Sequence, residues 1–223
     1  MLISVVMPVL NEEKLIQRSL EVLAGWEDLE LIVVDGGSED RTAELAAEYA
    51  TVLASNPGRP QQMNHGAQHA NGEILWFVHV DTTLPEDAPI YVRNAVSDGY
   101  IGGAFRTRFD ETNWFWDLLT SIDNLRTRLF RIYFGSRAMF VKKDTFNQLG
   151  GFPQVAFLED SAFSKLLRKV GPTVMVDSVA LESFRRFRET GPIRQLLLDI
   201  VLLGGFNIGV SPDLLARFYK HIR

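Results

Sequence analysis

The chain has 223 residues, of which 46% are hydrophobic and 23% are charged, as in an ordinary soluble globular protein. Its 23 basic and 28 acidic residues give a formal charge of −5, so the overall charge does not draw it to nucleic acid or to an anionic membrane. The absence of cysteine excludes disulfides, cysteine-ligated zinc, iron–sulfur clusters and thiol nucleophiles. It also suits a reducing cytoplasm, which is the predicted location.

The sequence indicates neither a signal peptide nor a spanning helix. The apolar N-terminus has no basic segment and runs into Asn11 and Glu12, so it is typical of a buried strand. No stretch reaches the roughly 18 uninterrupted apolar residues that a spanning helix needs.

The first half of the chain alternates short apolar runs with helical patterns, which is typical of a sheet wound with crossover helices. Apolar runs predict strands at 3–9, 29–34, 52–54 and 74–80, and helical spacing predicts helices at 12–24, 40–49 and 61–69. The second half is less regular, with strands predicted at 100–109, 138–141 and 173–177 and helices at 114–134, 158–170 and from 191 onward. We therefore predict an α/β fold with a mostly parallel central sheet flanked by helices, in a single domain.

Polar side chains follow three of the predicted parallel strands. Residues 8–12 end the first strand, Asp35 ends the second, and Asp81 ends the fourth. Each acid alone is typical of a helix cap or a solvated loop. Because ligands of open α/β sheets bind at the carboxyl ends of the strands, three polar ends in register favour a binding site.

Two glycine-containing segments could approach a ligand. After Asp35, Gly36 begins a tight turn that permits close backbone approach. Arg59, followed by several amides, stands where a helix N-terminus and a cation could hold a phosphate. The dinucleotide G-x-G-x-x-G spacing and the P-loop are both absent, which argues against nicotinamide enzymes and P-loop NTPases.

His79 and Asp81 are two residues apart at the end of a predicted strand. Oxygen ligands with one imidazole suit Mn²⁺ or Mg²⁺ bridging to a diphosphate. The alternative for His79 is a structural histidine whose ring nitrogens are satisfied by the protein.

Five segments, in order along the chain, carry a resemblance to a known family: 8–13 (PVLNEE), 33–42 (VVDGGSEDRT), 79–82 (HVDT), 150–153 (GGFP) and 158–160 (LED). Together they resemble an inverting family-2 glycosyltransferase with the GT-A nucleotide-diphospho-sugar transferase fold, over most of the chain. Residues 58–67 are further similar to a small bacterial subgroup, some members of which are labelled arsenosugar-biosynthesis glycosyltransferases.

For the donor nucleotide, the resemblance implies roles for residues at the strand ends. Pro8, Asn11 and Glu12 would line the nucleotide site, with Gly36 beside it. Asp35 would bond the uracil or the ribose, and Arg59 would lie near the base or the phosphates.

For the chemical step, the resemblance implies a metal site and a base. His79-Val80-Asp81 stands at the family's Asp-x-Asp metal motif, with His79 in the first place and Asp81 retained. Glu159 and Asp160 match a Glu-Asp pair whose second acid is the general base. Without the family pattern, the pair is typical of acids at a helix N-terminus.

Two segments depart from the family. Gly135-Ser136-Arg137 stands where the subgroup has Gly-Asp-Gln, so donor or acceptor contacts there are expected to change. Phe187 replaces a tryptophan, so any stacking on the acceptor would fall to Phe187.

The expected function is therefore transfer of a sugar from a nucleoside-diphosphate donor, in first place a UDP-sugar, to an unknown acceptor hydroxyl. The transfer would be inverting and assisted by Mn²⁺ or Mg²⁺, with no role for nucleic acid. Residues 1–110 would bind the nucleotide sugar and residues 111–182 would hold the acceptor and the base. Two alternatives remain: a non-catalytic nucleotide-sugar-binding scaffold, and a sugar-phosphate nucleotidyltransferase, which usually has a Gly-rich loop where this chain has PVLNEE.

Residues 183–223 form a basic amphipathic tail, with seven basic residues against three acidic residues. The basic residues are Arg185, Arg186, Arg188, Arg194, Arg217, Lys220 and Arg223. An apolar face on the helix after Pro192 leaves three roles open: peripheral contact with the inner membrane face, packing on the core, or a homodimer interface.

Overall fold

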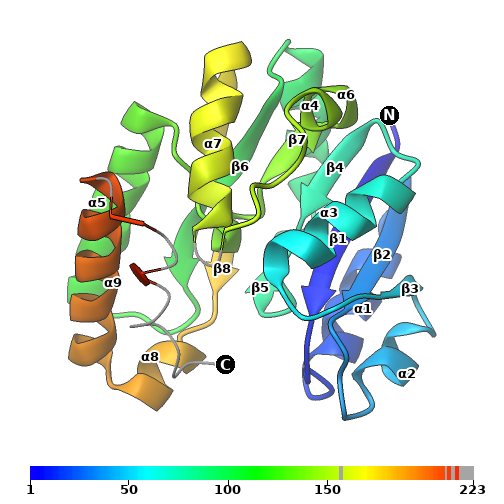
Figure 1. Cartoon of the computed structure of the whole chain (residues 1–223), viewed down its shortest axis with the longest axis horizontal. Helices are drawn as coiled ribbons and strands as arrows, with labels where there is room; N and C mark the ends of the chain where they lie inside the picture. The colour runs from blue at the N-terminus through cyan, green and yellow to red at the C-terminus, as the bar shows by residue number, and fades with distance from the viewer. Residues whose placement is uncertain (156–157, 209, 212–213, 216–223) are drawn as a thin grey trace.

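The computed structural model describes residues 1–155, 158–208, 210–211 and 214–215 (Figure 1). Its centre is an eight-stranded sheet in the order β3-β2-β1-β4-β7-β6-β8-β5. The strands are β1 (Ile3–Val9), β2 (Leu29–Asp35), β3 (Thr51–Ala54), β4 (Ile74–Phe77), β5 (Thr82–Thr83), β6 (Gly102–Phe109), β7 (Phe140–Lys142) and β8 (Thr173–Glu182).

The sheet is mixed but mostly parallel. Among the described strands, the pairs β1–β2, β2–β3, β1–β4 and β6–β8 are parallel, while β4–β7, β6–β7 and β5–β8 are antiparallel. The predicted α/β class is confirmed. The short strand β7 joins the two parallel parts, because it pairs with β4 on one side and with β6 on the other.

Helices cover both faces of the sheet. They are α1 (Ile16–Ala24), α2 (Thr42–Ala46), α3 (Arg59–His69), α4 (Ala88–Ser97), α5 (Trp114–Phe130), α6 (Lys143–Gln148), α7 (Glu159–Val170), α8 (Arg185–Thr190) and α9 (Pro192–Asn207), with a 3₁₀ turn at Gly135–Arg137. No helix in the described part of the chain is long and apolar enough to cross a membrane.

Strand β1 explains the two-sided core. Successive side chains of a strand point to opposite faces, so Val5 and Met7 belong to the core cluster that includes residues of α1 and α4, whereas Val6 belongs to the cluster that includes residues of α3 and α7. Both faces of the strand are therefore buried, and its sequence is a nearly continuous apolar run.

The structure corrects several predicted boundaries. The fourth strand ends at Phe77 rather than at residue 80, because the chain turns there and Thr82 N donates to His79 O. Helix α5 ends at Phe130 rather than at residue 134, since Arg131 adopts a left-handed conformation with φ 53°. Strand β8 continues to Glu182, and the elements β5, α4, α6 and α8 were not predicted.

The basic tail is described only in part. Helices α8 and α9 carry Arg185, Arg186, Arg188 and Arg194. Arg217, Lys220 and Arg223 lie outside the described residues.

Candidate active site at the carboxyl ends of the strands

The loops after β1 and β2 are bonded to each other. Asn11 N donates to Ser38 Oγ (2.9 Å), and Glu39 N donates in return to Asn11 Oδ1 (2.8 Å). Asn11 has φ 55°, a left-handed conformation that asparagine tolerates better than most residues. Asn11 thus holds the two loops in place beside the strand ends.

Gln62 of α3 connects the ends of β1 and β2 through its side-chain amide. Its Nε2 donates to Val9 O (2.9 Å) and to Val34 O (2.8 Å), and the residue is 4% exposed. A Cβ added at Gly36 would lie 3.1 Å from Gln62 Nε2, so a larger residue there would press on this contact. Pro8 lies in β1 opposite Val34.

Asp35 is engaged by its own turn. Its Oδ2 accepts from Gly37 N (3.2 Å) and Ser38 N (3.0 Å), and its Oδ1 accepts from Ser38 Oγ. The residue is 8% exposed. The carboxylate therefore shapes the loop, and its role toward a base or ribose stays a prediction.

Arg59 joins the segment after β4 to the acidic pair of α7. Its Nη2 lies 2.8 Å from His79 Nε2, and its Nε lies 3.2 Å from Glu159 Oε1. The side chain of Glu159 is only 5% exposed and that of Arg59 is 40% exposed, so this ion pair is partly withdrawn from water. His79 and Glu159 lie 20 and 100 residues from Arg59 in the sequence, and both contact its guanidinium group.

Arg185 forms a second charged centre at the first and fourth strand ends. Its two terminal nitrogens each lie 3.1 Å from a carboxylate oxygen of Glu12, and Nη2 lies 3.8 Å from Asp81 Oδ2. Burial raises the pKa of Asp81, against the lowering effect of Arg185, while Glu12 raises it further. Arg59 also lowers the pKa of Asp81, and it contacts His79 two residues before Asp81, so the two charged centres lie close together.

Asp160 lies in the first turn of α7 and is 6% exposed. Its Oδ1 accepts from Ser161 N (2.6 Å), which orients the carboxylate. The preceding Leu158 has φ 60°, so the chain reaches the helix through a left-handed residue. Glu159 and Asp160 thus enter the site from a fixed helix N-terminus.

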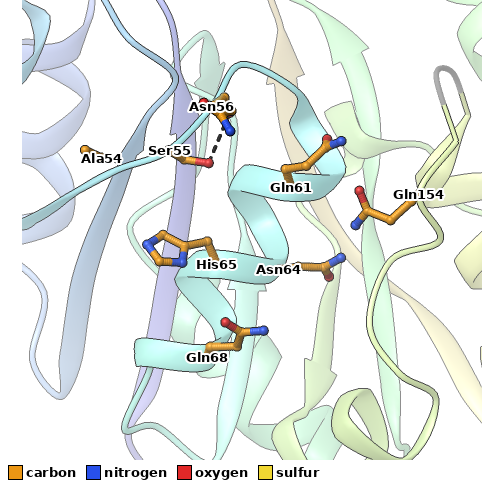
Figure 2. Close-up of a pocket in the computed structure, with 8 residues that line it drawn as sticks. All are labelled: Ala54, Ser55, Asn56, Gln61, Asn64, His65, Gln68 and Gln154. Atoms are coloured by element: carbon orange, nitrogen blue, oxygen red, sulfur yellow. Dashed lines mark hydrogen bonds between the residues drawn. The ribbon is translucent and has the colours of Figure 1, made fainter.

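An open pocket of about 700 Å³ lies beside this site, at the end of β3 and along α3 (Figure 2). Uncharged hydrogen-bonding side chains dominate its wall: Asn56, Gln61, Asn64, His65, Gln68 and Gln154. It adjoins the strand ends because Ser55 N, in its wall, donates to Asp35 O at 2.8 Å. Its amides suit a neutral, polar ligand group.

The predicted metal ligands fit a divalent ion unequally. Asp81 offers a half-buried carboxylate, which is a hard ligand that Mn²⁺ or Mg²⁺ accepts. Burial and the charge of Arg59 lower the pKa of His79 well below its usual value, so the imidazole is neutral at pH 7. However, arginine only donates, so the Nε2 lone pair of His79 is taken by Arg59.

No group of three or more His, Asp or Glu side chains in the described residues is arranged to hold a metal ion. An ion at Asp81 would therefore need further oxygen ligands from a bound diphosphate and water. His79 as a ligand stays a prediction that requires Arg59 to move.

The sequence did not point to two contributors. Arg185 contacts Glu12 across 173 residues of sequence, a contact that was not predicted, although the arginines of the basic tail were considered to face either donor phosphates or solvent. Gln62 was seen as one of several amides at a helix start, without its link to the strand ends. Phe187 packs against Phe109 (5.0 Å between ring centroids) and Trp116 (5.1 Å), and its role in stacking on an acceptor stays a prediction.

The sequence matches the model of glycosyl transferase family 2 over residues 4–166. The chain belongs to this family. The family model extends from β1 into α7, and so includes the strand ends, Asp81 and the Glu159-Asp160 pair. The predicted family is thus confirmed, whereas the arsenosugar subgroup label stays a prediction.

Among curated relatives, a probable glycosyltransferase YdaM of Bacillus subtilis is 24% identical over 197 residues, covering 76% of this chain and 47% of the relative. An undecaprenyl-phosphate 4-deoxy-4-formamido-L-arabinose transferase of Proteus mirabilis is 31% identical over 128 residues, covering 51% of this chain and 39% of that protein. The chain therefore spans about half the length, or less, of these relatives.

Solved structures share the fold. A mannosyltransferase from Pyrobaculum calidifontis, in complex with GDP-Man and Mn²⁺, has a TM-score of 0.66 at 19% identity, with 89% of this chain and 64% of that chain covered. A glucosyl-3-phosphoglycerate synthase from Mycobacterium tuberculosis, in complex with Mn²⁺, UDP and phosphoglyceric acid, also has a TM-score of 0.66 at 19% identity, covering 94% and 79%. The family-2 glycosyltransferase has a GT-A-like fold, as predicted.

Proposed function

We propose that this glycosyltransferase moves a sugar from a UDP-sugar to an acceptor hydroxyl with inversion, assisted by Mn²⁺ or Mg²⁺. One observation carries the proposal. Arg59 contacts His79, two residues before Asp81 in the segment after β4, and Glu159, next to Asp160. The residues proposed for the donor and those proposed for the acceptor therefore meet at one side chain.

On the donor side, the departing diphosphate would leave with negative charge that must be neutralised. The guanidinium groups of Arg59 and Arg185 lie at the strand ends, where they can bond phosphate oxygens in a charge-assisted manner. A divalent ion on Asp81 would supply further charge when bound. UDP is proposed as the carrier because of Asp35 at the β2 end and because a structural neighbour binds UDP with Mn²⁺.

On the acceptor side, the hydroxyl must lose its proton as it attacks the anomeric carbon. Asp160 is proposed to accept that proton, which is worth on the order of 10²- to 10⁴-fold in rate. Glu159 is proposed to position this helix end through its ion pair with Arg59. Direct displacement from the face opposite the diphosphate needs no carboxylate nucleophile, and it inverts the anomeric centre.

Calorimetry of UDP with Mn²⁺ and with EDTA tests the donor and metal assignments together. We expect tighter binding with Mn²⁺, and we expect Asp81→Ala to remove the metal-dependent part. Glu86→Ala is the matched control, because Glu86 is an exposed acid five residues further along the chain. Equal UDP affinity with Mn²⁺ and EDTA in the unaltered protein would refute the metal site.

A second function is favoured by Arg185. Its guanidinium pairs with Glu12 and lies near Asp81. A non-catalytic scaffold that binds nucleotide sugars could keep both contacts and would need no metal. A screen of nucleotide sugars for Mn²⁺-dependent donor hydrolysis separates the two functions. Donor binding without any turnover or hydrolysis would favour the scaffold.

A further inference from the structure

Helix α5 exposes an apolar stripe that the glycosyltransferase site does not use. Its members recur at helical spacing of three or four residues and are 52–78% exposed: Trp114, Leu118, Ile122, Leu125 and Leu129. Phe115 and Phe130 flank it at 38% and 56% exposure. Only Trp116 and Thr127 of this helix are buried, so the apolar side faces away from the core.

Helix α9 exposes a second stripe of the same kind. Ile193, Leu197, Ile200 and Val201 are 57–73% exposed, whereas Gln195 and Leu202 on the other side are buried. Figure 1 shows α5 and α9 at the same end of the molecule, beyond β6 and β8. Two helices thus present rows of large exposed apolar side chains, and exposed apolar surface of this kind marks an interaction site.

Unpaired cations border these stripes. Arg128 and Arg131 of the α5 end and Arg194 of α9 are exposed, and none has an acidic partner within the described part of the chain. Arg128 and Arg194 each adjoin an apolar member in sequence, Leu129 and Ile193. The surface is therefore apolar with a positive rim, although the whole chain carries −5.

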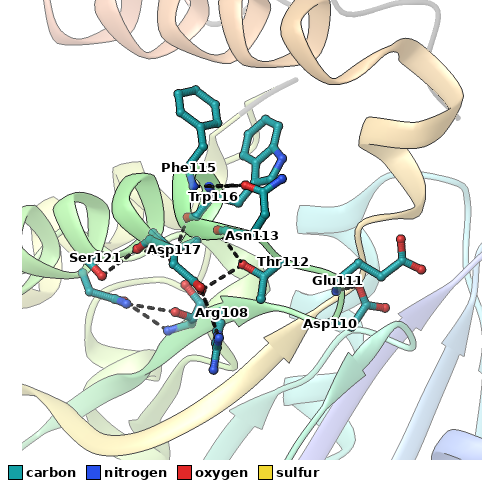
Figure 3. Close-up of polar contacts among 12 residues, drawn as sticks. Arg108, Asp110, Glu111, Thr112, Asn113, Phe115, Trp116, Asp117 and Ser121 are labelled. Atoms are coloured by element: carbon teal, nitrogen blue, oxygen red, sulfur yellow. Dashed lines mark hydrogen bonds and ion pairs between the residues drawn. The ribbon is translucent and has the colours of Figure 1, made fainter.

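The start of α5 is firmly attached to the rest of the fold. Asn113 Oδ1 caps the helix by accepting from Phe115 N (3.0 Å) and Trp116 N (3.2 Å), and Asp117 accepts from Arg108 Nε (2.9 Å) and Thr112 Oγ1 (2.8 Å), as Figure 3 shows. The buried Trp116 ring packs on Phe184 at 5.2 Å, next to Arg185 of the site.

We propose that the exposed faces of α5 and α9 dock this protein on the surface of an anionic lipid bilayer. The apolar side chains would enter the boundary of headgroups and acyl chains, and Arg128, Arg131 and Arg194 would meet the anionic headgroups. The positive charge around these faces favours an anionic bilayer over a second copy of the chain. A second copy of the chain, docked through the same faces, would bring the same unpaired arginines toward each other, whereas an anionic surface neutralises them.

Co-sedimentation of the full chain with vesicles tests the proposal without donor, metal or turnover, so it stands apart from the proposed function. We expect binding to phosphatidylcholine vesicles that contain phosphatidylglycerol, weaker binding to phosphatidylcholine alone, and a decline with added salt. Leu125→Glu with Leu129→Glu should weaken binding by at least about tenfold, since two apolar side chains are lost from the bilayer. Arg128→Glu should weaken binding to the anionic vesicles about fivefold or more.

The matched control is Ile90→Glu, which places the same acid at a residue 56% exposed on α4. It should bind vesicles as the unaltered chain does, and circular dichroism should show native folding in every variant. Tryptophan emission gives a second readout: vesicles should shift it to the blue, and Trp114→Phe should remove most of that shift.

Three results would overturn the proposal: no binding to anionic vesicles, equal loss in Ile90→Glu and the α5 variants, or no change in the α5 variants. Light scattering adds a fourth. If the chain does not bind vesicles but forms a dimer, and the α5 variants dissociate that dimer, these faces would be the interface with a second copy instead.

Discussion

Two arginines organise the charges of the site at the scale of single residues. A planar guanidinium has several donors in fixed directions, so one side chain can bond two partners on different elements. Arg59 uses this to hold His79 and Glu159, and Arg185 uses it to hold both oxygens of Glu12. The acids of the site are therefore kept close together without leaving their charges unopposed.

Asp160→Asn should preserve folding and donor binding while turnover falls by about 10²-fold or more. The amide keeps the size of the side chain and can still accept from Ser161 N, but it cannot accept the acceptor's proton. Steady-state kinetics beside UDP calorimetry separate the two effects. Asp144→Asn, an exposed acid in the first turn of α6, is the control, and unchanged turnover in Asp160→Asn would remove this residue from the mechanism.

Arg137 has a structural contribution within Gly135-Ser136-Arg137, the segment that differs from the bacterial subgroup that residues 58–67 resemble. It is 1% exposed, pairs with Asp123, and donates to Asn124 Oδ1 at 2.8 Å. Burial raises the pKa of Glu182, and the charge of Arg137 lowers it, so this cation also offsets a second, partly buried acid. Arg137 therefore joins α5 to the end of β8.

Arg137→Met should lower the free energy of unfolding by about 3 kcal/mol or more, because it removes a buried cation that pairs with Asp123, donates to Asn124 and offsets the charge of Glu182. Urea unfolding measures the loss. Arg106→Met is the control, since its ion pair with Asp177 is exposed and is worth less than about 1 kcal/mol. Similar losses of unfolding free energy in the two variants would show that the buried contacts of Arg137 stabilise the fold no more than an exposed ion pair does.

At the scale of elements, an aromatic cluster connects β6, α5 and α8. Phe109, Trp116, Phe184 and Phe187 pack with ring centroids 5.0–5.9 Å apart, and the rings of Phe184 and Phe187 are stacked. Because α8 also carries Arg185, the cluster sets where that guanidinium meets Glu12. Packing at this end of the molecule thus supports the charged site.

Phe184→Ala should destabilise the fold by about 3–5 kcal/mol, since it removes a side chain only 7% exposed from the centre of that cluster. It should also weaken UDP binding through the displaced Arg185. Phe130→Ala, at a residue 56% exposed, is the control and should change stability by about 0.5 kcal/mol or less. A Phe184→Ala variant as stable as this control would show that the cluster is not needed to hold α8.

For the whole molecule, the sheet crosses the boundary between the two predicted functional halves. Strand β4 of the first half pairs with β7 of the second, and β7 pairs with β6, which belongs to the first half again. Unfolding of either half would therefore remove strand partners from the other. The division at residue 110 is therefore a proposal about function, and the structure gives the halves a shared core.

We expect a single cooperative unfolding transition in urea, with far-ultraviolet circular dichroism and tryptophan emission following the same curve. We expect the whole sheet to be lost in one step because strands β4, β7, β6 and β8 are successive neighbours in it. Two separated midpoints would contradict it and would support independent halves. The Asp160→Asn variant should unfold at the same midpoint, because its change removes only a charge at the site.

The sequence by itself determined the parts of this protein that depend on local periodicity. Alternating and helical apolar patterns predicted β1, β2 and α1 close to their observed positions, because core-facing residues repeat with the geometry of each element. The polar residues at the ends of β1 and β2 were predicted to lie together, since parallel neighbours bring their carboxyl ends to one edge. Family motifs added Asp81 and the Glu159-Asp160 pair.

Only the tertiary structure decided which distant residues meet and which apolar faces stay open. The pattern of α5 looks the same whether its stripe packs on a core or faces outward, and only the arrangement of its neighbours leaves Leu125 exposed. Arg185 reaches Glu12, and His79 gives its lone pair to Arg59, through contacts that no local pattern encodes. Such contacts depend on how the chain returns to the same sheet edge, which is a property of the folded whole.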